Sequence, residues 1–280
     1  MHLILASQKL SPNVTQMVLS ALRVAAVARA GQFVIVRASA GAERIPLTIA
    51  QADPLAGTIT LVIQAVGAST FELASYRAGG ALADVAGPLG NPTALLPAGH
   101  AVCVGGGVGT AVVYPIAAAL AAGGVAVTSI IGGRSREWVI YEQELRAVGE
   151  IIVCTDDGSY GRPGFVTEAL AELLAAEEVP IDEVYAVGPV PMMRAVSELT
   201  RPYGVKTTVS LNAIMLDGTG MCGGCRVGID GQTRYACVDG PDFDGHKVNF
   251  AQLSDRLSTY REFEQAALAR WQAAHAEAAL

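Results

Sequence analysis

The feature that most constrains the fold is a long stretch without any charged side chain, from Ala101 to Gly133. It is long enough to span a bilayer, and the chain has a mean hydropathy of +0.39. Glycine and proline interrupt it, however, at Gly105, Gly106, Gly107, Gly109, Pro115, Gly123 and Gly124. Such breaks indicate a buried strand, turn, helix and strand, because parallel sheets covered on both faces have continuous apolar strands. We therefore expect no membrane span.

Strands and helices alternate from about residue 100 to 208, which predicts a doubly wound parallel sheet. The strand AVCV is followed by GGGVGT and then by a helix over 110–122. A glycine-rich turn between strand and helix lets the backbone approach a pyrophosphate at the helix N-terminus. The spacing differs from G-x-G-x-x-G, so this is a variant nucleotide loop, with a merely tight turn as the alternative. Its candidate contacts are Gly105, Gly107, Gly109 and Thr110.

Three later turns follow strands of the same predicted sheet, at the edge where open α/β folds bind ligands. The strand VAVTSIIGG ends where an adenosine ribose or its phosphate would lie, and the sequence does not distinguish NAD from NADP. An acidic glycine loop follows IIVCT, and it either binds ribose or amide groups or only caps a turn. A proline-rich turn after VYAVGP begins a helix. It either lies at the ligand site or serves only in helix capping and core packing. The candidates at these turns are Gly132, Arg134, Asp156, Asp157, Gly188, Pro189 and Met192.

Residues 1–95 are predicted to form a small antiparallel barrel, since strands such as QFVIVRA and ITLVIQAV are separated by turns and closure removes exposed edges. ERIPLTIA places an arginine, whose fork of donors suits a pyrophosphate, on an extended segment; a solvated strand arginine is the alternative. GAST precedes a helix and offers N–H groups and hydroxyls to a phosphate, or is a plain N-cap. The candidates are Arg44, Pro46, Leu47, Thr48, Val62, Gln64, Gly67, Ser69 and Thr70.

Three of the five cysteines lie in one glycine-rich segment with metal-ligand spacing. Cys222 and Cys225 form a C-x2-C pair, and Cys237 follows after eleven residues. With Asp217 the segment reads D-x4-C-x2-C-x11-C, a plant-type [2Fe-2S] spacing whose first cysteine is replaced by aspartate. Because a carboxylate can bind ferric iron, this predicts a Cys3Asp [2Fe-2S] cluster. A structural zinc that includes His246, and a group of buried thiols without metal, are the alternatives.

Charge and cysteine usage narrow the class of protein. The chain is acidic, with a net charge of -7 and a pI near 5.1, and its sequence contains no basic stripe. These two features exclude nucleic acid as a partner. The N-terminus has no signal-peptide pattern. Cys103 and Cys154 lie in apolar runs and are expected to be inert buried thiols. Grouped ligand cysteines without a disulfide framework favour a reducing cytoplasm.

From Ala251 onward the chain has helical spacing and an alanine-rich tail, whose final turns we expect to fray. The pattern predicts one C-terminal helix with an apolar face. That face comprises Leu253, Leu257, Tyr260, Phe263, Leu268 and Trp271.

Five stretches in this order resemble the ferredoxin reductase superfamily: ERIPLTIA, GGGVGT, TDDGSYGRPGFVT, VYAVGPVPMM, and DGTGMCGGCRV with CVDGPDFDGHKVNF. They look like the FAD- and NAD-binding electron-transfer subunits of dihydroorotate dehydrogenase and of NADH-dependent ferredoxin:NADP oxidoreductase. The resemblance implies FAD along the Arg44 and Ser69 segments, NAD(P) at the glycine loop, and a [2Fe-2S] cluster. The dihydroorotate branch has cysteine where Asp217 stands, whereas the other branch has aspartate, so the chain resembles the second branch.

The second branch implies a larger flavin and [4Fe-4S] partner subunit resembling the glutamate synthase small subunit, and indirectly ferredoxin. The expected domains are an FAD barrel over 1–95, an NAD(P) domain over 96–208, a cluster domain over 209–250 and a helix over 251–280. The expected function is hydride exchange between NAD(H) and FAD and single-electron transfer through the cluster, with or without bifurcation. No catalytic nucleophile or general base is predicted. A dihydroorotate dehydrogenase electron-transfer subunit and a zinc-containing nucleotide-sensing module are the alternatives.

Overall fold

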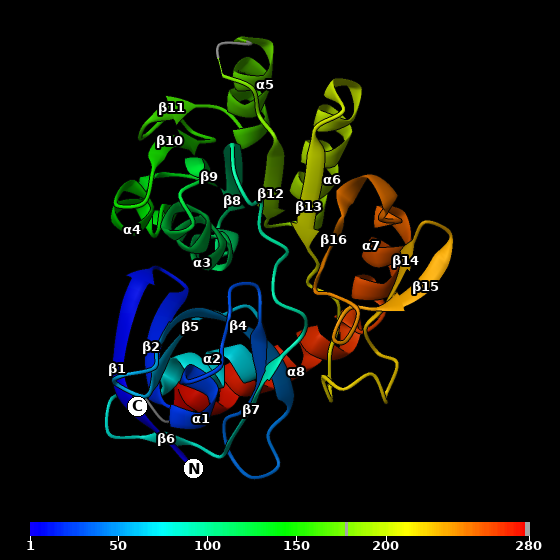
Figure 1. The fold of residues 1–280 in the computed structure, drawn as a ribbon. Helices are drawn as coiled ribbons and strands as arrows, with labels where there is room; N and C mark the ends of the chain where they lie inside the picture. The colour runs from blue at the N-terminus through cyan, green and yellow to red at the C-terminus, as the bar shows by residue number, and fades with distance from the viewer. Residues whose placement is uncertain (177–178, 278–280) are drawn as a thin grey trace.

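In the computed structural model, which describes residues 1–176 and 179–277, the chain forms two seven-stranded sheets, a two-stranded hairpin and a C-terminal pair of helices (Figure 1). Within the described residues, no helix is long and apolar enough to cross a membrane. The uncharged run instead forms strand β8, helix α3 and strand β9, as predicted.

The N-terminal sheet is antiparallel, in the order β6-β1-β2-β5-β4-β3-β7. Strands β6 and β7 follow each other in the chain but lie at opposite ends of this order, so the sheet curls into the near-closed barrel that the sequence predicted. Alternate strand residues fill its core, among them Leu19, Ile59 and Leu61. The elements are β1 (His2–Ser11), β2 (Val14–Ser20), α1 (Leu22–Ala25), β3 (Phe33–Arg37), β4 (Arg44–Asp53), β5 (Thr58–Gln64), α2 (Ala68–Ser75), β6 (Ala81–Leu82) and β7 (Asp84–Leu89).

The second sheet has the order β11-β10-β9-β8-β12-β13-β16, and all of its pairs are parallel except β13 with β16. Its central strands are buried on both faces, which explains their uninterrupted apolar sequence. The elements are β8 (His100–Gly106), α3 (Gly109–Ala122), β9 (Ala126–Gly133), α4 (Glu142–Arg146), β10 (Glu150–Thr155), β11 (Arg162–Pro163), α5 (Val166–Ala176), β12 (Glu183–Val187), α6 (Val190–Thr200), β13 (Lys206–Ser210) and β16 (Asp242–Asp244).

Residues 211–249 form the cluster segment, which contains the hairpin β14 (Arg226–Ile229) and β15 (Gln232–Tyr235) and supplies β16 to the edge of the second sheet. The hairpin turn is Asp230-Gly231, with φ of 52° and 72°. Positive φ at both central residues is the conformation that a two-residue hairpin favours. The segment is therefore folded onto the nucleotide-type sheet.

The prediction of one C-terminal helix with one apolar face was wrong. The chain forms α7 (Phe250–Ser258) and α8 (Arg261–Glu277), with Tyr260 at the break. Helix α7 packs its buried Phe250 against the cluster segment, whereas α8 packs against α2 of the barrel (Figure 1). One straight helix cannot follow both surfaces, and Phe263, assigned to the apolar face, is 74% exposed. The predicted fraying of the last turns concerns residues 278–280, outside the described residues.

Candidate functional site

The four predicted cluster ligands meet as two pairs. Asp217 Oδ1 lies 3.5 Å from Cys222 Sγ, and Cys225 Sγ lies 3.1 Å from Cys237 Sγ. The hairpin explains the second pair, because Cys225 precedes β14 and Cys237 follows β15, and the paired strands bring their ends together. The eleven-residue spacing in the sequence is thus the length of one hairpin.

Hydrogen bonds prepare the Asp217 carboxylate to act as a ligand. The backbone N–H groups of Thr219 and Cys222 donate to its two oxygens at 3.1 and 2.8 Å. These bonds, that of Thr219 foremost, lower the Asp217 pKa to about 2. The carboxylate is therefore ionised at neutral pH, as metal binding requires.

The two cysteines of the inner pair are almost fully buried, with 1% of each residue exposed, whereas Cys222 is exposed. Burial first, and then the neighbouring Cys225, raise the Cys237 pKa to about 12. The Cys237 thiol therefore needs a cation nearby to become a thiolate, and a coordinating metal deprotonates a thiol outright. The buried cysteine pair, and the second pair of half-buried Asp217 with exposed Cys222, fit two iron atoms with two protein ligands each.

The geometry disfavours the zinc alternative. His246 Nε2 lies 3.0 Å from Thr200 Oγ1, and the His246 backbone carbonyl accepts from Arg201, so this residue is fixed on the α6 side. Within the described ranges, no three His, Cys, Asp or Glu side chains converge as one metal ion would require. The paired donors suit a two-iron cluster better than a single tetrahedral ion.

The cluster loop packs against the outside of the barrel. Gly218 has φ +72°, and a Cβ there would lie 2.6 Å from Leu89 Cδ1 and 3.0 Å from Ile35 Cγ1. Only glycine allows this backbone conformation and this close approach together. The loop is also fixed from behind, where Arg256 Nη2 of α7 donates to the Gly224 carbonyl at 2.9 Å.

Three of the four predicted flavin residues of β4 lie on that same outer face. Successive strand residues alternate between faces, so Leu47 packs with the barrel core while Arg44, Pro46 and Thr48 face outward. Ile35 lies directly opposite Pro46, and Ile35 also meets Gly218 of the cluster loop. Arg44 and Thr48 are four residues apart on this face. At about 3.4 Å per residue, the face therefore extends about 14 Å from the Arg44 end of β4 to the end near the cluster loop.

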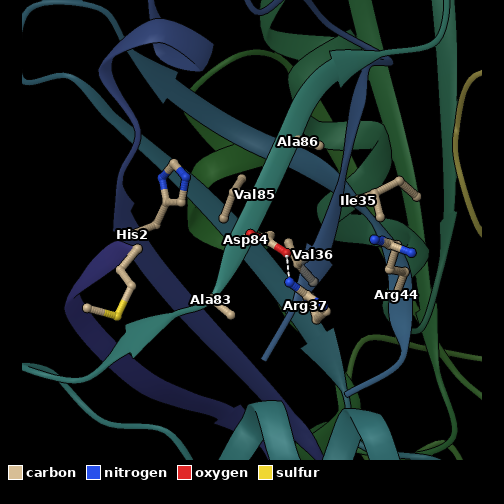
Figure 2. Close-up of a pocket in the computed structure, with 10 residues that line it drawn as sticks. His2, Ile35, Val36, Arg37, Arg44, Ala83, Asp84, Val85 and Ala86 are labelled. Carbon is tan, nitrogen blue, oxygen red and sulfur yellow. Dashed lines mark ion pairs between the residues drawn. The ribbon is translucent and has the colours of Figure 1, made fainter. Parts of the chain in front are cut away.

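A pocket of about 320 Å³ lies at the charged end of this face (Figure 2). Arg44 lines it, and directly across the strand pair lies Arg37, which forms an ion pair with Asp84 at 2.5 Å. The buried Nε of Arg37 has no hydrogen-bond partner within the described chain. Sequence reasoning missed Arg37 and Asp84; the available signal was the two-residue strand period, which places Arg37 on the same face of β3 as Ile35.

Helix α2 brings the second predicted flavin segment to the Arg44 end of β4. Ser69 Oγ in its first turn donates to Glu43 Oε2 at 2.5 Å, so a carboxylate already occupies an anion-binding position there. Thr70 Oγ1 accepts from the Gly67 N–H at 2.9 Å and thereby closes the first turn. The donor set at this end fits a diphosphate, and Glu43 would have to give up its bond to Ser69.

Two other predicted flavin residues lie on β5, where the barrel meets the second sheet. Val62 is 8% exposed and packs in a cluster with Ala111 of α3 and Tyr141. Gln64 is half-buried at the end of the strand. Both remain predictions, and Val62 is the less accessible to a ligand.

The predicted nicotinamide residues meet at the carboxyl ends of β8 and β12, where the strand order reverses. A Cβ on Gly106 would lie 2.5 Å from Met192 Sδ and 3.2 Å from Pro189 Cδ, so the two turns are in contact. A Cβ on Gly107 would meet nothing within 4 Å, which leaves the backbone open to a ligand. Such a switch point is where doubly wound sheets bind nucleotides.

The remaining predicted nucleotide residues are side by side at the ends of β9 and β10. The Asp156 and Asp157 N–H groups donate to the carbonyls of Gly133 and Arg134 at 3.1 Å each. Asp157 also accepts from the Ser159 N–H at 2.9 Å, and hydrogen bonding from Ser159 lowers the Asp157 pKa. Gly132 is the penultimate residue of β9 and pairs with Cys154 just before this loop, while Thr110 is buried behind the glycine loop.

Asp242 is a half-buried acid whose carboxyl oxygen Oδ1 is shielded from solvent, and the sequence analysis missed it. It lies on β16, and Thr93 Oγ1 donates to its Oδ2 at 2.5 Å, while its Oδ1 has no partner among the described residues. Burial raises its pKa to about 6. The folded state holds this proton more tightly than the unfolded chain, so Asp242 stabilises the fold fully below about pH 4, and this contribution is lost as the pH rises through about 6.

We expect Asp242→Asn to remove that pH dependence, because an amide cannot ionise. A pKa difference of this size corresponds to about 3 kcal/mol. Above pH 6.5 the variant should therefore have a higher thermal midpoint than the wild type, and the gap should close towards pH 4. Asp255→Asn, a change at an exposed position on α7, is the control. A constant difference at every pH would contradict the assignment.

Comparison with known proteins identifies the family of this chain. Residues 212–249 match the iron-sulfur cluster binding domain of dihydroorotate dehydrogenase B. The chain is also 44% identical, over 87% of its length and 86% of the relative's, to a Thermotoga maritima protein named "Dihydroorotate dehydrogenase B (NAD(+)), electron transfer subunit homolog". The chain belongs to the family of dihydroorotate dehydrogenase B electron-transfer subunits. As a member of this family it is an electron-transfer oxidoreductase subunit.

Solved structures agree with this assignment. A chain of the NADH-dependent reduced ferredoxin-NADP oxidoreductase, described for flavin-based electron bifurcation, is 40% identical to this family member with a TM-score of 0.93. The match covers 97% of this chain and 98% of that chain. The ferredoxin reductase of carbazole 1,9a-dioxygenase, 21% identical over 73% of this chain and 65% of that chain, has a TM-score of 0.60 and shares the fold. The predicted ferredoxin reductase-like fold is confirmed.

Proposed function

We propose that this chain exchanges hydride between NAD(H) and FAD on the outer barrel face, and passes single electrons through its [2Fe-2S] cluster to or from a larger partner subunit. The observation that carries the proposal is the contact of Gly218 with Ile35 and Leu89, because it packs the cluster loop against the face that bears Pro46 and Thr48. FAD supplies the conversion between two-electron and one-electron chemistry.

The roles of the protein groups follow from their positions. Arg44 and the first turn of α2 hold the diphosphate, and Pro46 and Thr48 orient the flavin ring towards the cluster loop. The Gly105–Thr110 loop and the Gly188–Met192 turn hold the nicotinamide nucleotide at the β8–β12 edge. Asp217, Cys222, Cys225 and Cys237 hold the cluster. The chain divides accordingly into an FAD barrel over 1–95, a nucleotide domain over 96–208, a cluster domain over 209–250 and a C-terminal region over 251–280.

The partner is a larger flavin and [4Fe-4S] subunit that resembles the glutamate synthase small subunit and exchanges electrons with ferredoxin. Two observations support this version: the aspartate at position 217, and the similarity along nearly the whole chain to the ferredoxin-NADP oxidoreductase chain. The five free cysteines support a reducing, cytoplasmic location.

Anaerobic purification with native partners tests the proposal. We expect bound FAD, iron and acid-labile sulfide, bleaching of the flavin band by NADH, and co-purification of a flavin and [4Fe-4S] subunit. A colourless chain would contradict the proposal. The second candidate function is that of a dihydroorotate dehydrogenase electron-transfer subunit, and the matched cluster-binding domain favours it. Co-purification of a TIM-barrel flavoprotein would support this second function instead of the first.

Asp217→Cys is expected to keep the cluster but lower its midpoint potential, by on the order of tens of millivolts. A thiolate donates more electron density than a carboxylate, and the variant loses the two N–H donors that now stabilise negative charge on Asp217. A redox titration followed by electron paramagnetic resonance measures the shift. Asp230→Asn, in the hairpin turn, removes a carboxylate from the same segment and should leave the potential unchanged. An unchanged potential in Asp217→Cys would contradict Asp217 as a ligand.

A further inference from the structure

Helix α2 is the proposed diphosphate-binding helix, and few side chains hold it on the barrel. Ser39 Oγ donates to Glu72 Oε1 at 3.0 Å, and Ser69 donates to Glu43, the bond that a diphosphate would displace. It has eight residues, too few to be stable by themselves. Only Leu73 of α2 is buried, on the side that faces the barrel core. On its other side, Phe71 is half-buried and needs a second surface to pack against.

Helix α8 provides that surface. The Trp271 ring lies 5.2 Å from the Phe71 ring, centroid to centroid, at an interplanar angle of 32°. The Trp271 ring also stacks on His275 at 4.0 Å. Along the part of α8 whose side chains are described, residues 261–275, only Ala267, Leu268 and Trp271 are even half-buried. Because they are three and four positions apart, these three residues lie on one face of α8. The contact of this face with α2 is therefore the main packing contact of α8.

The other end of the C-terminal region is fixed at the cluster segment. Phe250 and Leu253 of α7 are buried there, and Arg256 donates to the Gly224 carbonyl beside Cys225. Helices α7 and α8 therefore form a strap, residues 250–277, from the cluster loop to the flavin side of the barrel (Figure 1).

We propose that Trp271 is a positioning residue for FAD: through Phe71 it holds α2 so that the Ser69 hydroxyl and the N–H groups of its first turn are fixed for the diphosphate. This inference rests on the proposed function, and it assigns a role to the strap that the ligand motifs do not reveal. Trp271 does not touch the diphosphate; it acts on the helix that does.

FAD affinity tests the proposal more directly than turnover does. Trp271→Ala is expected to raise the Kd for FAD about tenfold, equivalent to about 1.4 kcal/mol, measured by flavin fluorescence on protein depleted of FAD. Iron and acid-labile sulfide per chain should remain at the wild-type level. Trp271→Phe should restore most of the affinity, because a second aromatic ring can still pack on Phe71.

Two further variants separate positioning from general damage. Phe263→Ala removes an aromatic ring from the same helix at an exposed position and should leave FAD binding unchanged. Phe71→Ala should weaken FAD binding as Trp271→Ala does, and the double variant should bind no more weakly than either single variant.

Failure of the Trp271 role and failure of the proposed function give different results in these experiments. Trp271→Ala with wild-type FAD affinity, or with flavin and cluster lost in equal proportion, would overturn the role of Trp271 while leaving the proposed function intact. A wild-type chain that binds no FAD would overturn the proposed function itself.

Discussion

Cys225→Ser is expected to abolish the [2Fe-2S] cluster, with iron and acid-labile sulfide falling to near zero while FAD stays bound. Cys225 Sγ is buried and lies 3.1 Å from Cys237 Sγ, so its loss removes one of the two proposed ligands of the inner pair. A serine hydroxyl is a poor iron ligand because it is not ionised near neutral pH. Reduction of the flavin by NADH should survive, while transfer to a one-electron acceptor that depends on the cluster should be lost.

The control for this change is Cys154→Ala, which removes a buried thiol from β10 of the second sheet. It should keep its full iron content, whatever it loses in stability. Retention of iron and sulfide by Cys225→Ser would place the cluster elsewhere in the chain.

Gly109→Ala is expected to weaken NAD(H) binding at least about tenfold and to destabilise the fold by about 3 kcal/mol. A Cβ at this position would lie 2.2 Å from the Val187 carbonyl oxygen and 2.8 Å from Gly188 Cα. Both are backbone atoms, so the added methyl group can fit only if α3 moves away from β12. That movement would displace both turns at the proposed nicotinamide edge.

Flavin absorbance during titration with NADH under anaerobic conditions measures the binding effect, and thermal unfolding measures the stability effect. Gly123→Ala, at the other end of α3, is the matched control, because a Cβ there comes no closer than 3.2 Å to another atom. FAD and iron content should be the same in both variants. Normal NADH affinity in Gly109→Ala would exclude the glycine loop from the nucleotide site.

The elements that could be predicted from the sequence are those whose signal is local. The β8, glycine loop and α3 unit is contained within about twenty residues, and its apolar strand and glycine turn specify it without reference to the rest of the chain. The proposed ligand set from Asp217 to Cys237 is similarly compact, and the structure brings these residues together in pairs.

The features that could not be predicted depend on contacts between distant parts of the chain. Asp242 meets Thr93 from 149 positions away, and burial of its carboxyl group raises its pKa. The C-terminal helical pattern continues through Tyr260, yet the chain breaks there, because the cluster segment and α2 lie in different directions. Periodicity shows which face of a helix is apolar but not how many surfaces compete for it.

The placement of β16 has a consequence for chains that fail to acquire iron. This short strand is the last of the seven strands in its sheet and lies antiparallel along β13, which would otherwise be the open edge. Because the strand belongs to the iron-binding segment, loosening of that segment would uncover unpaired backbone N–H and C=O groups on β13. An exposed edge recruits other chains, so iron starvation should lead to aggregation of the protein as well as loss of its electron transfer.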